Sequence, residues 1–130
     1  MSAPITLRIP HARPYHGVAR LVVGGLAARL ELSYEDLEDV QLALESVLEE
    51  DGYIVGPDVA VELDFDDDAL EVGIGPLNGE RLRDDLSRES DETIGLRRLL
   101  ATVVGDASVE RRADGDWLRL EKAVRLHAPS

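Results

Sequence analysis

Several short stretches of the chain alternate apolar and polar residues, which is the period of β-strands with one buried face. The first covers residues 5–9, before a proline that ends it. Two more, 59–65 and 70–74, flank a run of three aspartates, where a turn is expected, and predict an antiparallel hairpin. A second hairpin is predicted over residues 109–124, with its tight turn at Asp114-Gly115.

Three other stretches repeat their apolar residues at the spacing of an α-helix, over residues 15–32, 33–50 and 94–104. Ser33 is a favourable N-cap for the second of these, and acids fill its first turn, where the helix dipole favours them. Gly24 and Gly25 interrupt the first, at a cost that predicts another element packed closely against it.

Between the two hairpins, residues 76–93 carry few apolar side chains and many charges of both signs. We expect a lid-like surface loop here, or a short exposed helix around residues 81–86. The order of elements predicts a single α+β domain over residues 1–130. Its architecture would be a two-layer sandwich, with one mostly antiparallel sheet covered on one face by about three helices.

The chain carries 27 acids against 14 bases, for a formal net charge of −13. Such a surface repels phosphate backbones and anionic lipids, so we expect neither direct nucleic-acid binding nor membrane binding. The sequence has no cysteine, which excludes disulfides, thiolate metal sites and cysteine nucleophiles. No stretch has the pattern of a membrane span or a signal peptide, and a cytoplasmic location is expected.

Few residues suggest chemistry by themselves. Glu45 and Glu49 lie four residues apart on the second predicted helix, so both carboxylates share one side of it. Their spacing alone leaves open whether they hold a ligand or face water. The aspartates 66–68 lack the spacing and glycine of a calcium loop, which favours a solvated turn. Trp117 stands beside the Asp114-Gly115 turn, where packing at a strand end is favoured over stacking on a ligand.

Five stretches carry a resemblance that extends over nearly the whole chain: ITLRIP, ARLVVGGLAARL, SYEDLEDVQLALESVLEE, LEVGI and IGLRRLLATVVGD. In order and spacing they resemble the anti-sigma-factor serine kinases of bacterial partner-switching systems, which have the histidine-kinase-like (GHKL) ATPase fold. The resemblance implies ATP and magnesium as cofactors. It also implies a sigma factor or an anti-anti-sigma protein as partner, and a homodimer.

In that family a helix offers Glu-x-x-x-Asn, in which the glutamate acts as base and the asparagine holds magnesium. Glu45 matches the glutamate, and is the catalytic residue that the resemblance implies. Glu49 replaces the asparagine. It would be the metal ligand, because a carboxylate can coordinate magnesium, but its charge opposes a neighbouring triphosphate.

The family's two other nucleotide motifs are also altered. Pro76 stands where an aspartate normally accepts from adenine, and a proline has no side-chain acceptor. The glycine-rich lid turn retains one glycine and the leucine that follows it. By resemblance, the positions that would contact the nucleotide are Asn78, Gly79, Thr93, Gly95 and Leu96.

These changes favour a regulatory protein that resembles an anti-sigma factor and acts by protein–protein binding, with ATP binding weak or lost. The alternative is an active ATP-dependent serine kinase that phosphorylates an antagonist of an anti-sigma factor. In it Glu45 would be the base, Glu49 a magnesium ligand, and Gly95 with Leu96 the lid hinge. A third interpretation is an α+β domain whose ligand the sequence does not identify.

Overall fold

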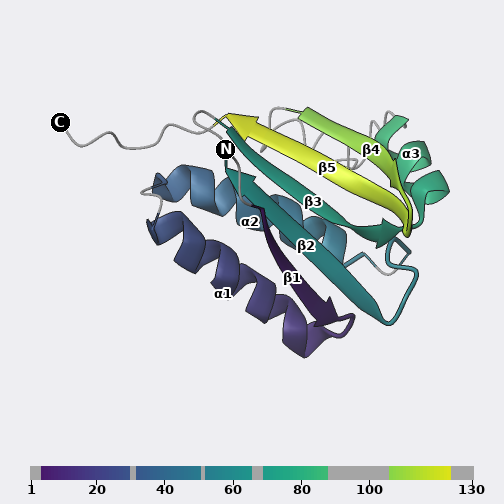
Figure 1. Ribbon diagram of the computed structural model, residues 1–130, viewed down its shortest axis with the longest axis horizontal. Coiled ribbons are helices and arrows are strands. Elements are labelled where there is room, and N and C mark those ends of the chain that lie inside the picture. The colour runs from purple at the N-terminus through teal and green to yellow at the C-terminus, as the bar shows by residue number, and fades with distance from the viewer. Residues whose placement is uncertain (1–3, 30–31, 51, 66–68, 88–105, 124–130) are drawn as a thin grey trace, which may run out of the picture.

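The computed structural model describes residues 4–29, 32–50, 52–65, 69–87 and 106–123 (Figure 1). Five strands and three helices are present in this part of the chain. In chain order they are β1 (Ile5–Pro10), α1 (Arg13–Arg29), α2 (Tyr34–Leu48), β2 (Asp58–Phe65), β3 (Ala69–Leu77), α3 (Gly79–Ser87), β4 (Asp106–Arg112) and β5 (Gly115–Ala123).

The strands form one sheet in the order β1-β2-β3-β5-β4, and every neighbouring pair is antiparallel. Their register explains why the alternating pattern of the sequence produces a sheet. One row across all five strands is entirely apolar: Leu7, Val61, Ile74, Leu118 and Val109. The adjacent row is polar or glycine: Thr6, Glu62, Gly73, Arg119 and Ser108. The sheet therefore has one apolar face and one solvent-facing face.

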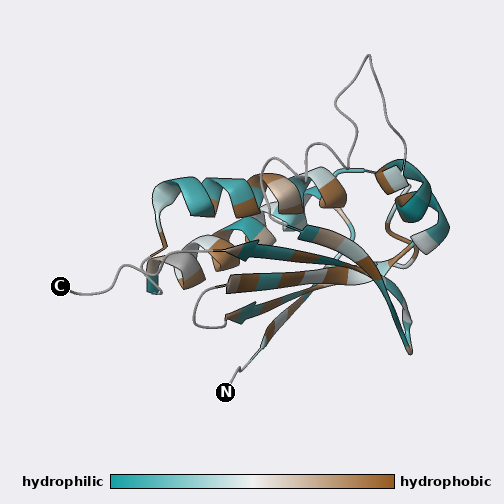
Figure 2. Ribbon diagram, turned by 90° about the horizontal axis from the view of Figure 1, so that it is seen from above, coloured by the Kyte–Doolittle hydropathy of each residue, from teal (hydrophilic) through white to brown (hydrophobic). Residues whose placement is uncertain are grey.

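Helices α1 and α2 lie side by side over one face of the sheet, and α3 lies beyond one end of it (Figure 2). The core fills the space between α1, α2 and the apolar sheet face, with buried residues from both layers. This confirms the predicted α+β fold with an antiparallel sheet and helices on one face. None of the helices in the described part of the chain is long and apolar enough to cross a bilayer.

Helix α2 begins as its sequence predicts. The Ser33 hydroxyl oxygen accepts a hydrogen bond of 3.1 Å from the Asp36 backbone N–H, which satisfies one of the free donors of the first turn. The helix ends at Leu48, with Glu49 as the C-cap, slightly earlier than predicted. Its buried residues are Val40, Ala43, Leu44, Val47 and Leu48, which form the apolar face that the spacing predicted.

Helix α1 runs from Arg13 to Arg29, whereas the apolar pattern predicted residues 15–32. The expectation of a close contact at its two glycines is wrong for Gly25. A Cβ atom built at Gly24 would make only an ordinary contact, 3.6 Å from Gln41 Nε2, and one at Gly25 would meet nothing within 4 Å. The α1–α2 contact therefore does not require Gly25.

Of the two alternatives for residues 76–93, the structure has the short helix, since Pro76 and Leu77 end β3 and α3 follows. The rest of that lid-like segment, the turn 66–68 and the helix predicted over 94–104 lie outside the described residues. Trp117 is 3 % exposed, and its indole N–H donates a hydrogen bond of 2.9 Å to Asp114. It packs at the start of β5, as predicted.

Candidate functional site

The two candidate carboxylates of α2 line a common groove. Glu45 and Glu49 share this groove, of about 550 Å³, with Arg13, His16, Gly17 and Arg20 of α1. Helix periodicity explains both sets, because residues four apart on α2 and residues three, four and seven apart on α1 lie on one side of each helix. The groove therefore lies along the contact between α1 and α2.

Glu45 has a cationic partner across this groove. Arg20 Nη1 donates a hydrogen bond of 2.7 Å to Glu45 Oε1, and the two side chains are 55 % and 29 % exposed. Gln41, one turn before Glu45, donates to the Arg20 backbone carbonyl at 3.2 Å. Arg20 is thus held from two positions on α2, and the Glu45 charge is compensated by an arginine on the adjacent helix.

His16 contributes a further polar group to the groove. Its Nε2 atom is buried and has no hydrogen-bond partner among the described residues, and its ring stacks on that of His11 with the centroids 5.9 Å apart. Burial lowers the pKa of His16, and the charges of His11 and Arg13 lower it further, while Glu49 opposes them. The imidazole therefore favours its neutral form more than a solvent-exposed histidine does.

Asn78 and Gly79 lie at the start of α3, and neither lines the groove of Glu45 and Glu49. Asn78 Oδ1 accepts a hydrogen bond of 3.2 Å from the Arg81 backbone N–H, and the Asn78 carbonyl accepts one of 3.0 Å from the Leu82 N–H. These bonds make Asn78 the N-cap of α3. A Cβ atom at Gly79 would lie 1.8 Å from Asp116 Oδ2, so Asp116 occupies the space that any larger residue would need.

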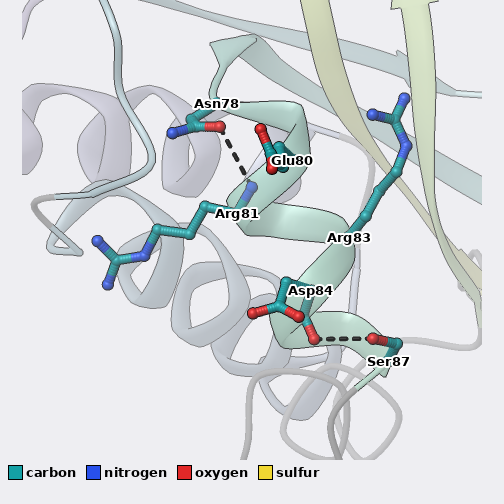
Figure 3. Close-up of a pocket in the computed structure, with 6 residues that line it drawn as sticks. All are labelled: Asn78, Glu80, Arg81, Arg83, Asp84 and Ser87. Atoms are coloured by element: carbon teal, nitrogen blue, oxygen red, sulfur yellow. Dashed lines mark hydrogen bonds between the residues drawn. The ribbon is translucent and has the colours of Figure 1, made fainter.

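A second cavity, of about 720 Å³, lies on α3 and is shown in Figure 3. It is lined by Asn78, Glu80, Arg81, Arg83, Asp84 and Ser87. Both of its arginines have acidic partners elsewhere: Arg81 contacts Glu50 at 3.0 Å, and Arg83 contacts Asp116 at 3.3 Å. The cavity is a charged surface whose cations are already compensated.

The residue before α3 is fixed to Tyr53, in the segment between α2 and β2. The Asn78 N–H donates to the Tyr53 carbonyl at 2.6 Å, and the Tyr53 hydroxyl donates to Asp85 at 2.5 Å. Tyr53 is 3 % exposed, and burial together with the hydrogen bond to Asp85 raises its pKa above the usual range of a tyrosine. These contacts give α3 a defined position relative to Tyr53.

The position that resembles the adenine-binding aspartate is filled differently. Pro76 follows Gly75, where an added Cβ atom would lie 2.4 Å from Trp117 Cδ2. The indole therefore occupies the surface of β3 directly before the altered motif, and the proline itself offers no acceptor. Thr93, Gly95 and Leu96 lie outside the described residues.

The structure thus brings Glu45 and Glu49 together, and separately Asn78 and Gly79, in two places that share no lining residue. Sequence reasoning missed the α1 residues of the first groove, above all Arg20, because only the packing of α1 on α2 brings it to Glu45. It also missed the capping role of Asn78. A signal for that role exists, since asparagine precedes a segment with an acid in its first turn.

Within the described residues, no group of three or more histidine or carboxylate side chains is arranged to hold a metal ion. Comparison of the sequence with models of known protein families and with curated proteins gives no match. The interpretation of the site therefore depends on its own geometry and on the resemblance of the short stretches described above.

Proposed function

We propose that this chain is a regulatory binding domain that resembles the anti-sigma-factor kinases in scaffold, and that it acts by holding a protein partner in the cytoplasm. Binding of ATP is weak or lost. By resemblance the partner is a sigma factor or an anti-anti-sigma protein. The observation that carries this proposal is that described residues at the nucleotide positions already have structural partners or structural roles.

Three contacts support this view. Glu45, at the position of the base, pairs with Arg20 at 2.7 Å. Asn78, at a position that the resemblance implies would contact the nucleotide, caps α3 with its side-chain oxygen. The space beside Gly79 is filled by Asp116. A nucleotide that used these positions would have to replace protein contacts, each of which costs free energy to break.

Electrostatics act in the same direction. Glu49 places a carboxylate where the family has a neutral asparagine, and the chain as a whole has a net charge of −13. A triphosphate is repelled by both, because magnesium neutralises only part of its charge. The residues present therefore do not fit the group that the scaffold resemblance implies.

Thermal unfolding with and without nucleotide tests the loss of ATP binding. The melting temperature is measured with 5 mM Mg-ATP, with 5 mM ATP plus EDTA, and with salt of matched ionic strength. A ligand at one hundred times its dissociation constant stabilises a protein by about 2.7 kcal/mol, which is several degrees for a domain of this size. We expect no shift beyond that of the salt control. A magnesium-dependent rise that Glu45→Gln or Glu49→Gln abolishes would refute this part of the proposal.

Direct binding tests the partner. The protein is immobilised and exposed to each purified sigma factor and each anti-anti-sigma protein of its source organism. The proposal expects one of them to bind with a dissociation constant that does not change when Mg-ATP is added. Binding by none of them would reject the regulatory assignment.

An ATP-dependent serine kinase is the second candidate, and one observation favours it. Glu45 and Glu49 line the same groove, as a base and a magnesium ligand would have to, and its volume of about 550 Å³ is within the range of small-molecule sites. This candidate predicts transfer of the γ-phosphate of labelled ATP to a serine of an anti-anti-sigma protein. Glu45→Gln should abolish the transfer, and an unlabelled acceptor would reject the candidate.

A further inference from the structure

Strand β1 is an edge of the sheet whose second side is not paired by any described strand. The two edges differ in charge. Four of the seven residues of β4 are charged, whereas β1 has one charged residue among six, Arg8. Charged residues are a common means of preventing a sheet edge from pairing with another chain. In the described structure, β1 is therefore the edge better suited to accept a further strand.

The helix next to this edge presents apolar residues beside it. Arg20 and Gly24 of α1 face α2, as their contacts with Glu45 and Gln41 show. Residues two positions from Arg20 lie about 200° away around a helix, so Val18 and Val22 are on the opposite flank. In Figure 1, α1 is the outer helix and β1 the outer strand, on the same side of the molecule.

This flank is exposed and continuous with the strand. Val18 is 40 % exposed, Tyr15 is 44 % exposed, and Ile5 at the start of β1 is 43 % exposed. We call the surface formed by Ile5, Arg8, Tyr15, Val18, Val22 and Arg29 the β1–α1 edge. Arg29 belongs to it because it follows Val18 and Val22 by eleven and seven residues, which is the same flank of the helix.

The charge of this surface is opposite to that of the molecule. Residues 4–29 contain four arginines and none of the 27 acids, so the rest of the chain carries every acid and only ten of the 14 bases. Arg8 and Arg29 are exposed, and no ion pair joins either of them to a described acid. Among the described residues, a protein with net charge −13 thus has two exposed cations near one sheet edge that no described acid pairs with.

We propose that the β1–α1 edge binds a strand-forming segment of a partner protein in which acidic residues alternate with apolar ones. Backbone groups of the segment would pair with β1. Its apolar side chains would lie on the helix side, against Val18 and Val22, and its acids on the opposite face, beside Arg8. Addition of a strand to a sheet edge is a common mode of peptide recognition, in which backbone hydrogen bonds supply affinity and alternate side chains supply specificity.

A second copy of the chain suits this surface less well. A symmetric β1–β1 pair would place the two Arg8 side chains near each other and bring together two molecules of charge −13, both of which are unfavourable. An acidic segment gains from Arg8 instead. The inference rests on the proposed function in so far as both assign the protein a polypeptide partner, and it adds the surface and the chemistry of that partner.

The experiment uses two fluorescein-labelled, end-blocked decapeptides, one alternating valine with glutamate and one alternating valine with lysine. Binding to the full-length protein is followed by fluorescence anisotropy at low and at moderate salt. The overall charge of the protein attracts the lysine peptide and repels the glutamate peptide. Preference for the glutamate peptide can therefore come only from a local cationic surface, and it should weaken as salt is added.

The variants are Arg8→Glu and Val18→Glu, with Val55→Glu as the matched control, because Val55 is an exposed valine (61 %) outside the β1–α1 edge. Circular dichroism verifies that each variant is folded. We expect the glutamate peptide to bind at least tenfold more tightly than the lysine peptide. Arg8→Glu and Val18→Glu should each weaken its binding at least tenfold, and Val55→Glu should not change it.

Equal or stronger binding of the lysine peptide would overturn the inference, as would equal losses in all three variants. Sedimentation of the free protein and flotation with phosphatidylserine vesicles are run in parallel. A dimer or a vesicle complex that Arg8→Glu disrupts would identify a different occupant and would also overturn it. If sigma-factor binding is found and Arg8→Glu leaves it intact, the inference fails while the proposed function stands. If the glutamate peptide binds as expected but no sigma factor or anti-anti-sigma protein does, the proposed function fails while the inference stands.

Discussion

The same substitution, glycine to alanine, should have opposite effects at two positions of this fold. Gly25 lies in the exposed interior of α1, and Gly75 lies in β3 beneath the ring of Trp117. Because the added atom is the same single methyl carbon in both cases, the difference in stability measures the surroundings of each glycine. The pair therefore tests how α1 and the solvent-facing side of the sheet are packed.

At Gly25 the expected change is stabilising. A glycine inside a helix costs about 0.8–1 kcal/mol relative to alanine, mainly through the greater entropy of the unfolded backbone. The new Cβ atom meets nothing within 4 Å, so no packing cost opposes this gain. Gly25→Ala should raise the free energy of unfolding by about 0.8–1 kcal/mol, or roughly 3–5 °C in melting temperature.

At Gly75 the expected change is destabilising. The new Cβ atom would lie 2.4 Å from Trp117 Cδ2 and 2.5 Å from Cγ. The ring cannot move away freely, because its N–H is bonded to Asp114 and the Arg112 guanidinium lies over it, 4.1 Å from the ring centroid. Overpacking of this kind costs about 1–3 kcal/mol, so Gly75→Ala should lower the free energy of unfolding by that amount.

Urea denaturation of the wild type and both variants measures the two effects, with the slope of the transition checked for constancy. Trp117 is the only tryptophan of the chain, so its fluorescence also reports directly on the displaced ring. A destabilised Gly25→Ala would mean that another group packs against this side of α1. A neutral Gly75→Ala with unchanged tryptophan emission would mean that the indole does not lie against β3.

Two further predictions concern the groups near the candidate site. The pKa of His16 is lowered in the folded state, so the unfolded chain binds a proton more readily, and the free energy of unfolding should fall as the pH falls through about 6.5. Wild type and His16→Gln are compared at pH 7.5 and 5.5. Relative to His16→Gln, the wild type should be less stable at pH 5.5 than it is at pH 7.5. A difference that does not change with pH would contradict this. Tyr53→Phe removes the hydrogen bond to Asp85 and should lower the free energy of unfolding, measured in urea, by about 1.5–3 kcal/mol. Tyr15→Phe, at an exposed residue, should cause no measurable change. Equal effects of the two variants would contradict the buried role of Tyr53.

The fold was predictable because its elements carry strong local patterns that agree with one another. The period of two in β2 and β3 gives rows of side chains that coincide across the sheet, such as Val61 opposite Ile74. Ser33 marks the start of α2 through a bond to its own first turn, three residues away. Such contacts are local or repeat at a regular spacing, so they can be predicted from the sequence pattern. Helix ends were predicted less closely, because the apolar pattern alone does not mark the terminal residue of a helix.

The candidate site was predictable only in part. Glu45 and Glu49 share a side of α2 by helix geometry alone, and the structure places both in one groove. Their cationic neighbour Arg20 is separated from Glu45 by 25 positions and comes from another helix, so no local pattern indicates the pair. The resemblance assigned Asn78 to a nucleotide-contacting position, although locally it caps the start of a helix. Tertiary packing and capping decided these roles.

The arginines of the N-terminal segment connect the two proposals. Arg13 and Arg20 line the groove of Glu45 and Glu49, and Arg20 is paired there with Glu45 and so is less available to a nucleotide. Arg8 and Arg29 have no such acid beside them among the described residues. An excess of acids elsewhere should favour pairing of every available cation, since each pair lowers the repulsion within a molecule of charge −13. Because no described acid pairs with these two exposed arginines and no described strand pairs with the outer side of β1, the proposed attraction toward an acidic polypeptide would be directed outward from β1 and α1.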